Sequence, residues 1–199
     1  MMKSSTATDG ELLPIGCPAI PNETTLDRAT LEQHFERILA ANGPALSRLA
    51  ASYTNTLADR DDLLQEIAFA LWQALPRFRG DCSERTFAFR IAHNRAITHL
   101  SRSKAHPSES VADDEMDLAD PAPGPDLHLA QRQTAARLRE AVHRLPVGYR
   151  QVIMLALEGL SYREISEVLG ISESNAGVRL NRARQMMQDF LNRDLREKK

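Results

Sequence analysis

Residues 159–187 constrain the fold more than any other stretch, because their residue types set the ends of two successive helices. Ser161 followed three residues later by Glu164 forms a capping box, which predicts that a helix starts at Ser161. Gly170 ends that helix, since glycine accepts the left-handed backbone found at helix ends. Ser172 can cap the next helix. The order of these signals predicts two short helices at a steep angle, a helix-turn-helix.

The second of these helices has two chemically different faces. Ala176, Leu180, Ala183 and Met187 recur at helical spacing and form an apolar stripe. The stripe predicts packing against the first helix. The opposite face suits a DNA major groove, because arginine pairs with guanine, asparagine with adenine, and a small apolar group contacts a thymine methyl. The alternative is a helical hairpin with a solvated basic face. The predicted DNA-reading residues are Ser174, Asn175, Val178, Arg179 and Arg182.

The composition favours an all-α protein built from two small helical domains. The chain has 199 residues, only 5% of them aromatic, and patterns typical of strands are nearly absent. We predict a disordered leader over residues 1–25, a first domain over 26–103, a linker over 104–128 and a second domain over 129–195. The net charge of -2 argues against a protein that coats nucleic acid indiscriminately.

Charge is strongly segregated around the predicted linker. Residues 77–104 hold seven Lys or Arg and two acidic residues, whereas residues 105–127 hold seven acidic residues and no Lys or Arg. An acidic, proline-rich segment without helical period predicts a flexible linker. It acts either as a plain tether or as an anionic strand that occupies a basic channel in a partner.

Three predicted helices of the first domain show apolar periodicity, and one aromatic residue among them is unexplained. A break at Asn42 and Gly43 predicts that one helix ends there and another starts at Pro44. A further helix is predicted to open at Asp61 or Asp62 and to be buried on nearly every turn. Phe69 lies on its less buried side. This position predicts either a protein-binding patch or one more buried side chain.

A predicted helix over residues 86–102 carries basic side chains on its outer side, with Phe89 interleaved. Such a face suits a phosphate backbone and unstacked bases. The alternative is a cationic face that is only solvated. The polar side chains of this face are Arg85, Arg90, Asn94, Arg95 and Arg102.

Two motifs carry a family resemblance. DDLLQEIAFALWQALPRFRGDCSERTFAFRIAHNRAITHLSR is similar to the polymerase-binding and promoter-melting segment of the extracytoplasmic-function (ECF) group of bacterial sigma factors. LPVGYRQVIMLALEGLSYREISEVLGISESNAGVRLNRAR resembles their upstream-promoter-binding domain. The resemblance implies a sigma factor of the sigma-70 family, which directs core RNA polymerase to specific promoters and helps open the DNA. The rival hypothesis is a stand-alone helix-turn-helix regulator with a sensor or dimerisation domain.

The resemblance also implies partners and residue roles. The partners would be promoter DNA, the beta-prime clamp helices and beta flap of core RNA polymerase, and an anti-sigma factor. The residues that face polymerase would be Asp62, Gln65, Glu66 and Phe69. The residues that bind and melt the downstream (minus-ten) element would be Arg79, Asp81, Arg85, Phe87, Arg90, Asn94 and Arg95. The residues of the reading face predicted above would bind the upstream (minus-thirty-five) element.

Several positions depart from the family's usual pattern. Phe87 stands where the family commonly has tryptophan, and Ser166 replaces an alanine where the two helices touch. A serine fits there if its hydroxyl bonds back to a carbonyl. Asn175, Ala176 and Gly177 replace a frequent Thr-Val-Lys, so the upstream sequence cannot be copied from relatives.

The sequence offers no sign of an enzyme. It has no phosphate-binding glycine loop, nucleophile elbow or metal-ligand spacing, so we expect no catalytic residues, no cofactor and no metal. Its two cysteines, Cys17 and Cys82, imply no disulfide framework and fit a reducing cytoplasm. Redox sensing through an exposed Cys82 would lack a partner cysteine near in sequence. No apolar run is long enough for membrane insertion.

Overall fold

The computed structural model describes residues 27–105 and 125–197, and these residues form seven α-helices, one short 3-10 helix and no strand. The prediction of an all-α protein is therefore confirmed. The predicted leader and most of the predicted linker lie outside the described residues. The helices of the first domain are α1 (Arg28–Ala51), α2 (Leu57–Ala74), the 3-10 helix η1 (Leu75–Arg77) and α3 (Glu84–Ala105). The helices of the second domain are α4 (Pro125–Arg144), α5 (Val147–Leu157), α6 (Tyr162–Leu169) and α7 (Glu173–Glu197).

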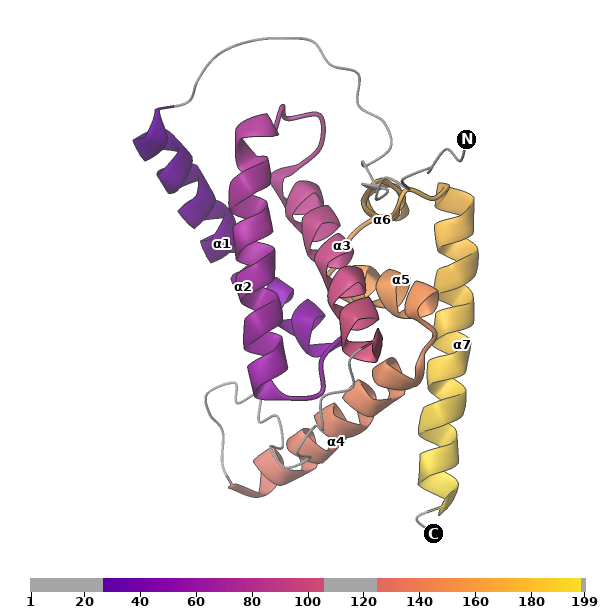
Figure 1. Cartoon of the computed structure of the whole chain (residues 1–199). Coiled ribbons are helices and arrows are strands. Elements are labelled where there is room, and N and C mark those ends of the chain that lie inside the picture. Colours follow the sequence, from indigo (N-terminus) through magenta and orange to yellow (C-terminus); the bar gives the residue numbers. More distant parts are fainter. Residues whose placement is uncertain (1–26, 106–124, 198–199) are drawn as a thin grey trace, which may run out of the picture.

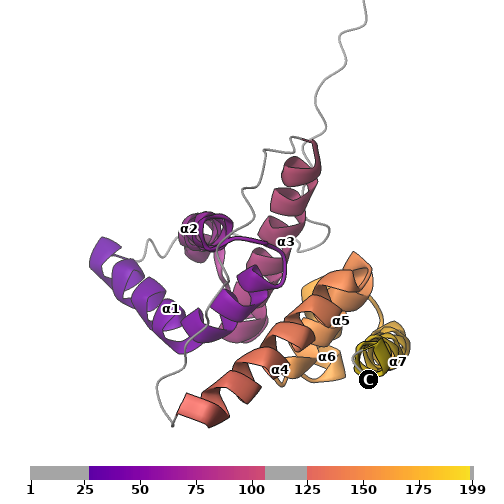
Figure 2. The same cartoon turned by 90° about the horizontal axis from the view of Figure 1, so that it is seen from below.

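The two groups of helices lie side by side. Figures 1 and 2 show α1, α2 and α3 on one side of the molecule and α4 to α7 on the other, with α7 along the outer edge. Helix α6 packs against α3, so the two domains meet directly.

One apolar core runs through both domains. Leu46, Leu49 and Leu63 of the first domain belong to the same buried cluster as Leu155 and Ile165 of the second. The first domain has an additional small cluster made by Ile38, Leu71, Leu75 and Ala88. Burial of apolar surface is the main favourable contribution to folding, so the shared cluster favours contact between the domains.

Helix α1 is continuous through Pro44, and the predicted break at Asn42 and Gly43 is wrong. A proline inside a helix removes one hydrogen bond and costs roughly 3 kcal/mol. Burial on both sides of the proline offsets that cost, because Ile38 and Leu46 are both buried in the core. Asn42 is buried too, and its side-chain amide donates to the Ile38 carbonyl at 2.9 Å. Tertiary packing has thus overridden a local stop signal.

Two further sequence predictions about the first domain are wrong. Helix α2 starts at Leu57 and not at Asp61 or Asp62, because the Thr56 hydroxyl accepts a hydrogen bond from the Asp59 backbone N–H at 3.1 Å. Phe89, predicted among the outer basic side chains of α3, is fully buried.

Candidate DNA and polymerase interfaces

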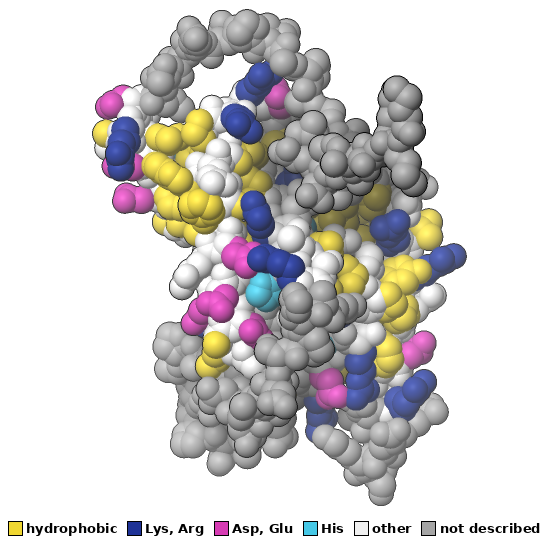
Figure 3. Space-filling view, in the orientation of Figure 1, with side chains coloured by type: hydrophobic (Ala, Val, Ile, Leu, Met, Phe, Trp, Pro, Cys, Tyr) yellow, Lys and Arg dark blue, Asp and Glu magenta, His cyan; other side chains and the backbone are white. Residues whose placement is uncertain are grey.

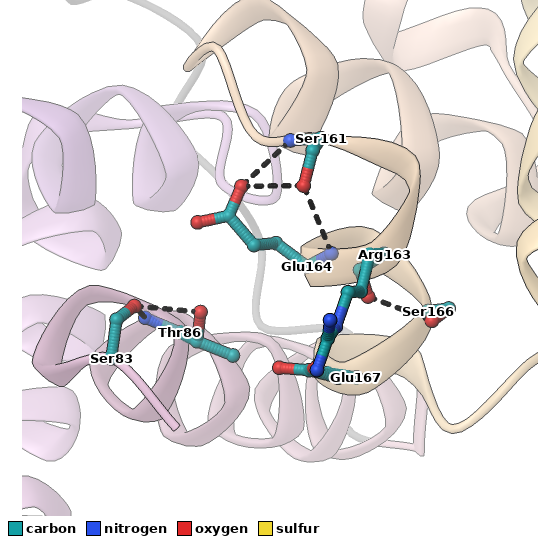
Figure 4. Close-up of polar contacts among 7 residues, drawn as sticks. All are labelled: Ser83, Thr86, Ser161, Arg163, Glu164, Ser166 and Glu167. Atoms are coloured by element: carbon teal, nitrogen blue, oxygen red, sulfur yellow. Dashed lines mark hydrogen bonds and ion pairs between the residues drawn. The ribbon is translucent and has the colours of Figure 1, made fainter. Parts of the chain in front are cut away.

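The predicted capping box is present at the start of α6. The Ser161 backbone N–H donates to Glu164 Oε2 at 2.8 Å, and the Glu164 backbone N–H donates to Ser161 Oγ at 3.3 Å (Figure 4). The hydrogen bond from the Ser161 backbone lowers the pKa of Glu164 from its usual value. The carboxylate is therefore held in its charged form, which suits the positive end of the helix dipole.

The turn between α6 and α7 also follows the sequence prediction. Gly170 has φ 66°, in the left-handed region, and its N–H donates to the Ser166 carbonyl. The Ser166 hydroxyl donates to the Arg163 carbonyl at 2.7 Å, as its fit between the helices requires (Figure 4). The Ser172 hydroxyl accepts from the Asn175 backbone N–H at 3.2 Å and caps α7. However, α7 has 25 residues, so the second helix is long and not short.

We expect Ser161→Ala to lower the free energy of unfolding by about 1 kcal/mol, because it removes the N-cap of α6. For a chain of this size the change corresponds to a fall in melting temperature of roughly 2–4 °C. Thermal unfolding followed by circular dichroism measures it. Ser174→Ala is the control, since the Ser174 side chain is exposed and its replacement should stay within about 0.5 kcal/mol. Equal melting temperatures for Ser161→Ala and the wild type would contradict the capping role.

Helix α7 separates a buried stripe from an exposed face, as predicted. Ala176, Leu180, Ala183 and Met187 are all buried. On the opposite face Val178 is 49% exposed, and Ser174, Asn175 and Arg182 are exposed. Arg179 is half-buried. We call these five residues the reading face.

The predicted polymerase-binding residues share one face of α2. Asp62, Gln65 and Phe69 are exposed, and Phe69 is 62% exposed, so the alternative that it is one more buried side chain is wrong. Glu66 is half-buried, because its carboxylate pairs with Arg102 at 2.5 Å. We call these four residues the α2 face: Asp62, Gln65, Glu66 and Phe69.

The residues predicted to bind the downstream (minus-ten) element do not all lie on one side of the first domain. Phe87, Arg90 and Asn94 share one side of α3, and the Phe87 ring lies 4.7 Å from that of Phe78. The Nε atom of Arg90 is buried and has no hydrogen-bond partner among the described residues. Figure 3 shows hydrophobic side chains gathered over the upper part of this domain, with basic side chains beside them. Arg79 and Asp81 are exposed in the preceding loop, and Arg95 is half-buried one residue after Asn94.

Arg85 does not lie with the other downstream residues. It is two residues from Phe87, and side chains two apart on a helix point about 200° away from each other. Its guanidinium lies over the Phe89 ring at 5.6 Å and donates to the Glu158 carbonyl of the second domain. Arg85 therefore faces the domain contact, and the sequence alone did not place it there.

Polar contacts that the sequence does not predict also join the domains. Arg48 donates twice to the Glu158 carboxylate, at 2.7 and 2.8 Å, and the Glu158 side chain is only 7% exposed. Arg150 donates to the Ser52 carbonyl at 3.0 Å, and its guanidinium lies 5.6 Å from the centre of the Tyr53 ring. No local motif signals such contacts, since Arg48 and Glu158 are 110 positions apart.

Arg150 also makes hydrogen bonds within the second domain. Besides Ser52, it donates to the carbonyls of His143 and Leu145, where α4 ends.

Burial lowers the pKa of His143, which favours its neutral form. A neutral ring can still donate through Nε2, and this atom lies 3.0 Å from the Ala51 carbonyl at the end of α1.

The described residues contain no group of three or more His, Cys, Asp or Glu side chains placed to hold a metal ion. Among the described residues Cys82 forms no disulfide, and it is half-buried, whereas the sequence suggested an exposed one. Within the described ranges no helix combines the length and apolar character needed to cross a membrane.

Both domains match known families. Residues 38–106 match Sigma-70 region 2, and residues 135–187 match Sigma-70, region 4. The chain is 32% identical over 170 residues to the RNA polymerase sigma factor CnrH of Cupriavidus metallidurans, an alignment that covers 82% of this chain and 89% of CnrH. It is 30% identical over 190 residues to the ECF RNA polymerase sigma factor SigM of Mycobacterium tuberculosis, covering 89% of this chain and 93% of SigM.

A solved structure of CnrH in complex with the cytosolic domain of CnrY is also similar, with a TM-score of 0.61 and 27% identity over 82% of this chain and 90% of CnrH. A Sigma-70 region 2 domain followed by a Sigma-70 region 4 domain with a helix-turn-helix defines a promoter-recognition subunit. The chain belongs to the ECF group of the sigma-70 family of RNA polymerase sigma factors. It directs core RNA polymerase to specific promoters and helps open the DNA, and the stand-alone regulator is not favoured.

Proposed function

We propose that the chain divides initiation among three surfaces and has no catalytic site of its own. The reading face of α7 binds the minus-thirty-five element, and the α2 face binds the polymerase clamp helices. The loop before α3 and the side of α3 that carries Phe87, Arg90 and Asn94 bind the minus-ten element. The observation that carries this proposal is the reading face of α7, which is exposed except for the half-buried Arg179, lies opposite a buried stripe and carries groups suited to base edges. The chain acts in the cytoplasm, where its polymerase is found.

The downstream surface combines cationic and aromatic side chains. Phe87 is half-buried and can stack on an unpaired base, while Arg90 about one turn along α3 and Arg95 further along the helix supply positive charge. Asn94 adds an exposed amide beside them. Opening DNA requires unstacking a base, and a pocket that holds the base offsets that cost. Arg85 can join this surface only after the second domain moves away, because its guanidinium is bound to Glu158.

An inhibitory partner is part of the proposal. CnrH has been solved in complex with the cytosolic domain of CnrY, so a relative of this chain forms a complex with another protein. We expect a protein of the anti-sigma class to bind this chain as well. The beta flap of polymerase would contact the second domain in the active state.

Reconstituted transcription tests the proposed function. The purified full chain, added to core RNA polymerase, should give transcripts from discrete start sites on genomic DNA, whereas core polymerase alone should not. A chain that binds core polymerase but starts transcription at no discrete site would contradict the proposed promoter contacts. A gel shift without polymerase should show only feeble DNA binding.

Phe69→Ala is expected to weaken binding to core polymerase about tenfold, since a buried aromatic anchor typically contributes more than 1 kcal/mol to an interface. The side chain is exposed in the free chain, so thermal stability should change little. Titration of labelled protein with core polymerase measures the affinity. Gln33→Ala, an exposed change on α1, is the control and should bind as the wild type does. If Phe69→Ala bound core polymerase with wild-type affinity, Phe69 would not be part of the polymerase-binding surface.

A further inference from the structure

A hydrogen bond within the reading face links two of its residues. Asn175 Oδ1 accepts from Arg179 Nε at 3.1 Å, one helical turn along α7. Arginine carries only donors, so the amide of Asn175 must present its oxygen to Arg179 and turn its NH₂ group away. The orientation of the Asn175 side chain is therefore set by Arg179.

The guanidinium of Arg179 also rests against the second domain's own scaffold. A Cβ atom built on Gly148, near the start of α5, would lie 3.5 Å from Arg179 Nη1. The arginine therefore leans over a backbone that carries no side chain, which explains why Arg179 is half-buried while Asn175 is exposed. Within the described part of the chain, Asn175 is the side chain that holds this guanidinium through a hydrogen bond.

We propose that Asn175 is a positioning residue that holds Arg179 for a guanine, and that it does not itself read an adenine. The inference rests on the proposed role of Arg179 as a reader of the upstream element. Paired recognition of guanine needs two neighbouring N–H donors of the guanidinium. Because Asn175 occupies the Nε donor, the edge formed by Nη1 and Nη2 is the one left for a paired contact with the base.

Two consequences follow for recognition. Adenine pairing needs the amide oxygen of Asn175, and that oxygen faces Arg179 in this structure. A free arginine side chain samples many rotamers, and holding it in one of them reduces the entropy lost when DNA binds. The pair therefore specifies one guanine where the sequence alone suggested an adenine contact and a guanine contact.

Substitution of Asn175 leaves the helix start intact. The hydrogen bond that caps α7 uses the backbone N–H of Asn175 and the hydroxyl of Ser172, so Asn175→Ala keeps it. Asn175→Asp keeps an oxygen acceptor for Arg179 Nε but loses the NH₂ donors that adenine pairing requires. The two variants thus separate the positioning role from direct reading.

A double-mutant cycle on the holoenzyme tests the proposal. Core polymerase is combined with the wild type, Asn175→Ala, Arg179→Ala or the double variant, and initiation is measured on a mapped promoter and on versions changed at each base pair of the upstream element. The readout is the ratio of initiation between promoters, which cancels any uniform loss of affinity. Arg179→Ala should lose roughly ten- to a hundredfold of discrimination at one G·C pair.

The expected pattern is specific to positioning. Asn175→Ala should lose about three- to tenfold at the same pair and nothing further in the Arg179→Ala background, because the effect passes through Arg179. Asn175→Asp should retain the preference for guanine. Asn192→Ala, an exposed asparagine near the other end of α7, is the matched control and should keep all preferences.

Other outcomes overturn specific statements. If Asn175→Ala instead changes the preference at a different base pair, or adds fully to Arg179→Ala, Asn175 reads DNA directly and the positioning role is wrong. If Arg179→Ala leaves every upstream preference unchanged, the proposed function of Arg179 fails as well.

Discussion

Glu158→Lys is expected to separate the two domains in the free chain. The substitution removes the paired hydrogen bonds from Arg48 and places a second cation beside it, at a carboxylate that is almost fully buried. Breaking a buried pair costs about 3–5 kcal/mol, but Arg48 is more than half exposed, so we expect roughly 1–3 kcal/mol of weakened domain contact.

Small-angle scattering of the purified chain measures the separation as an increased radius of gyration. Glu158→Gln is the matched control, because its amide oxygen can still accept from Arg48, and it should expand the chain less. Promoter-dependent initiation by the holoenzyme should survive in both variants, since the proposed promoter contacts lie on separate domains. An unchanged radius of gyration for Glu158→Lys would show that the shared apolar core and the remaining polar contacts hold the domains together without the pair of Arg48 and Glu158.

Arg179→Ala is expected to weaken recognition of the upstream element by roughly 1–3 kcal/mol, the usual contribution of one paired contact between arginine and a base. The loss should depend on promoter sequence, because it removes a base contact. Holoenzyme binding to promoter fragments with intact and altered upstream elements measures it.

Arg184→Ala is the matched control for this prediction. It removes the same charge from the same helix, but Arg184 is exposed and lies on the side of α7 away from Val178 and Arg182. We expect at most a uniform, salt-dependent loss that is equal on all promoters. Equal sequence dependence for the two variants would contradict the assignment of Arg179 to the reading face.

The helix-turn-helix was predictable because its signals are local. A cap needs a side chain and a backbone N–H three residues apart, so Ser161 and Glu164 specify the start of α6 without help from the rest of the chain. The left-handed backbone at Gly170 is equally local. The stripe that ends at Met187 follows from helical geometry, and burial of that stripe exposes the opposite face.

Predictions that depended on neighbours in space were less accurate. Pro44 reads as a helix start, yet it lies inside α1 because the core holds both halves of that helix. The sequence predicts that Phe89 belongs to a basic outer face, yet it is fully buried in the apolar cluster shared by the two domains. The N-cap at Thr56, by contrast, is a local signal. The helix start was nevertheless predicted later in the chain, at the acidic residues that follow Thr56.

The sequence by itself determined the all-α class, the caps and turn of the helix-turn-helix and the exposed face of α7, because these depend on residues within a few turns of one another. Only the tertiary structure decided which way Arg85 faces and how Arg48, Glu158 and Arg150 join the domains. The physical reason is that such pairings depend on the relative placement of helices about a hundred residues apart in the chain. The same holds for Asn175 in part: its place on α7 is local, whereas the resting place of Arg179 over Gly148 comes from the packing of α5 and α7.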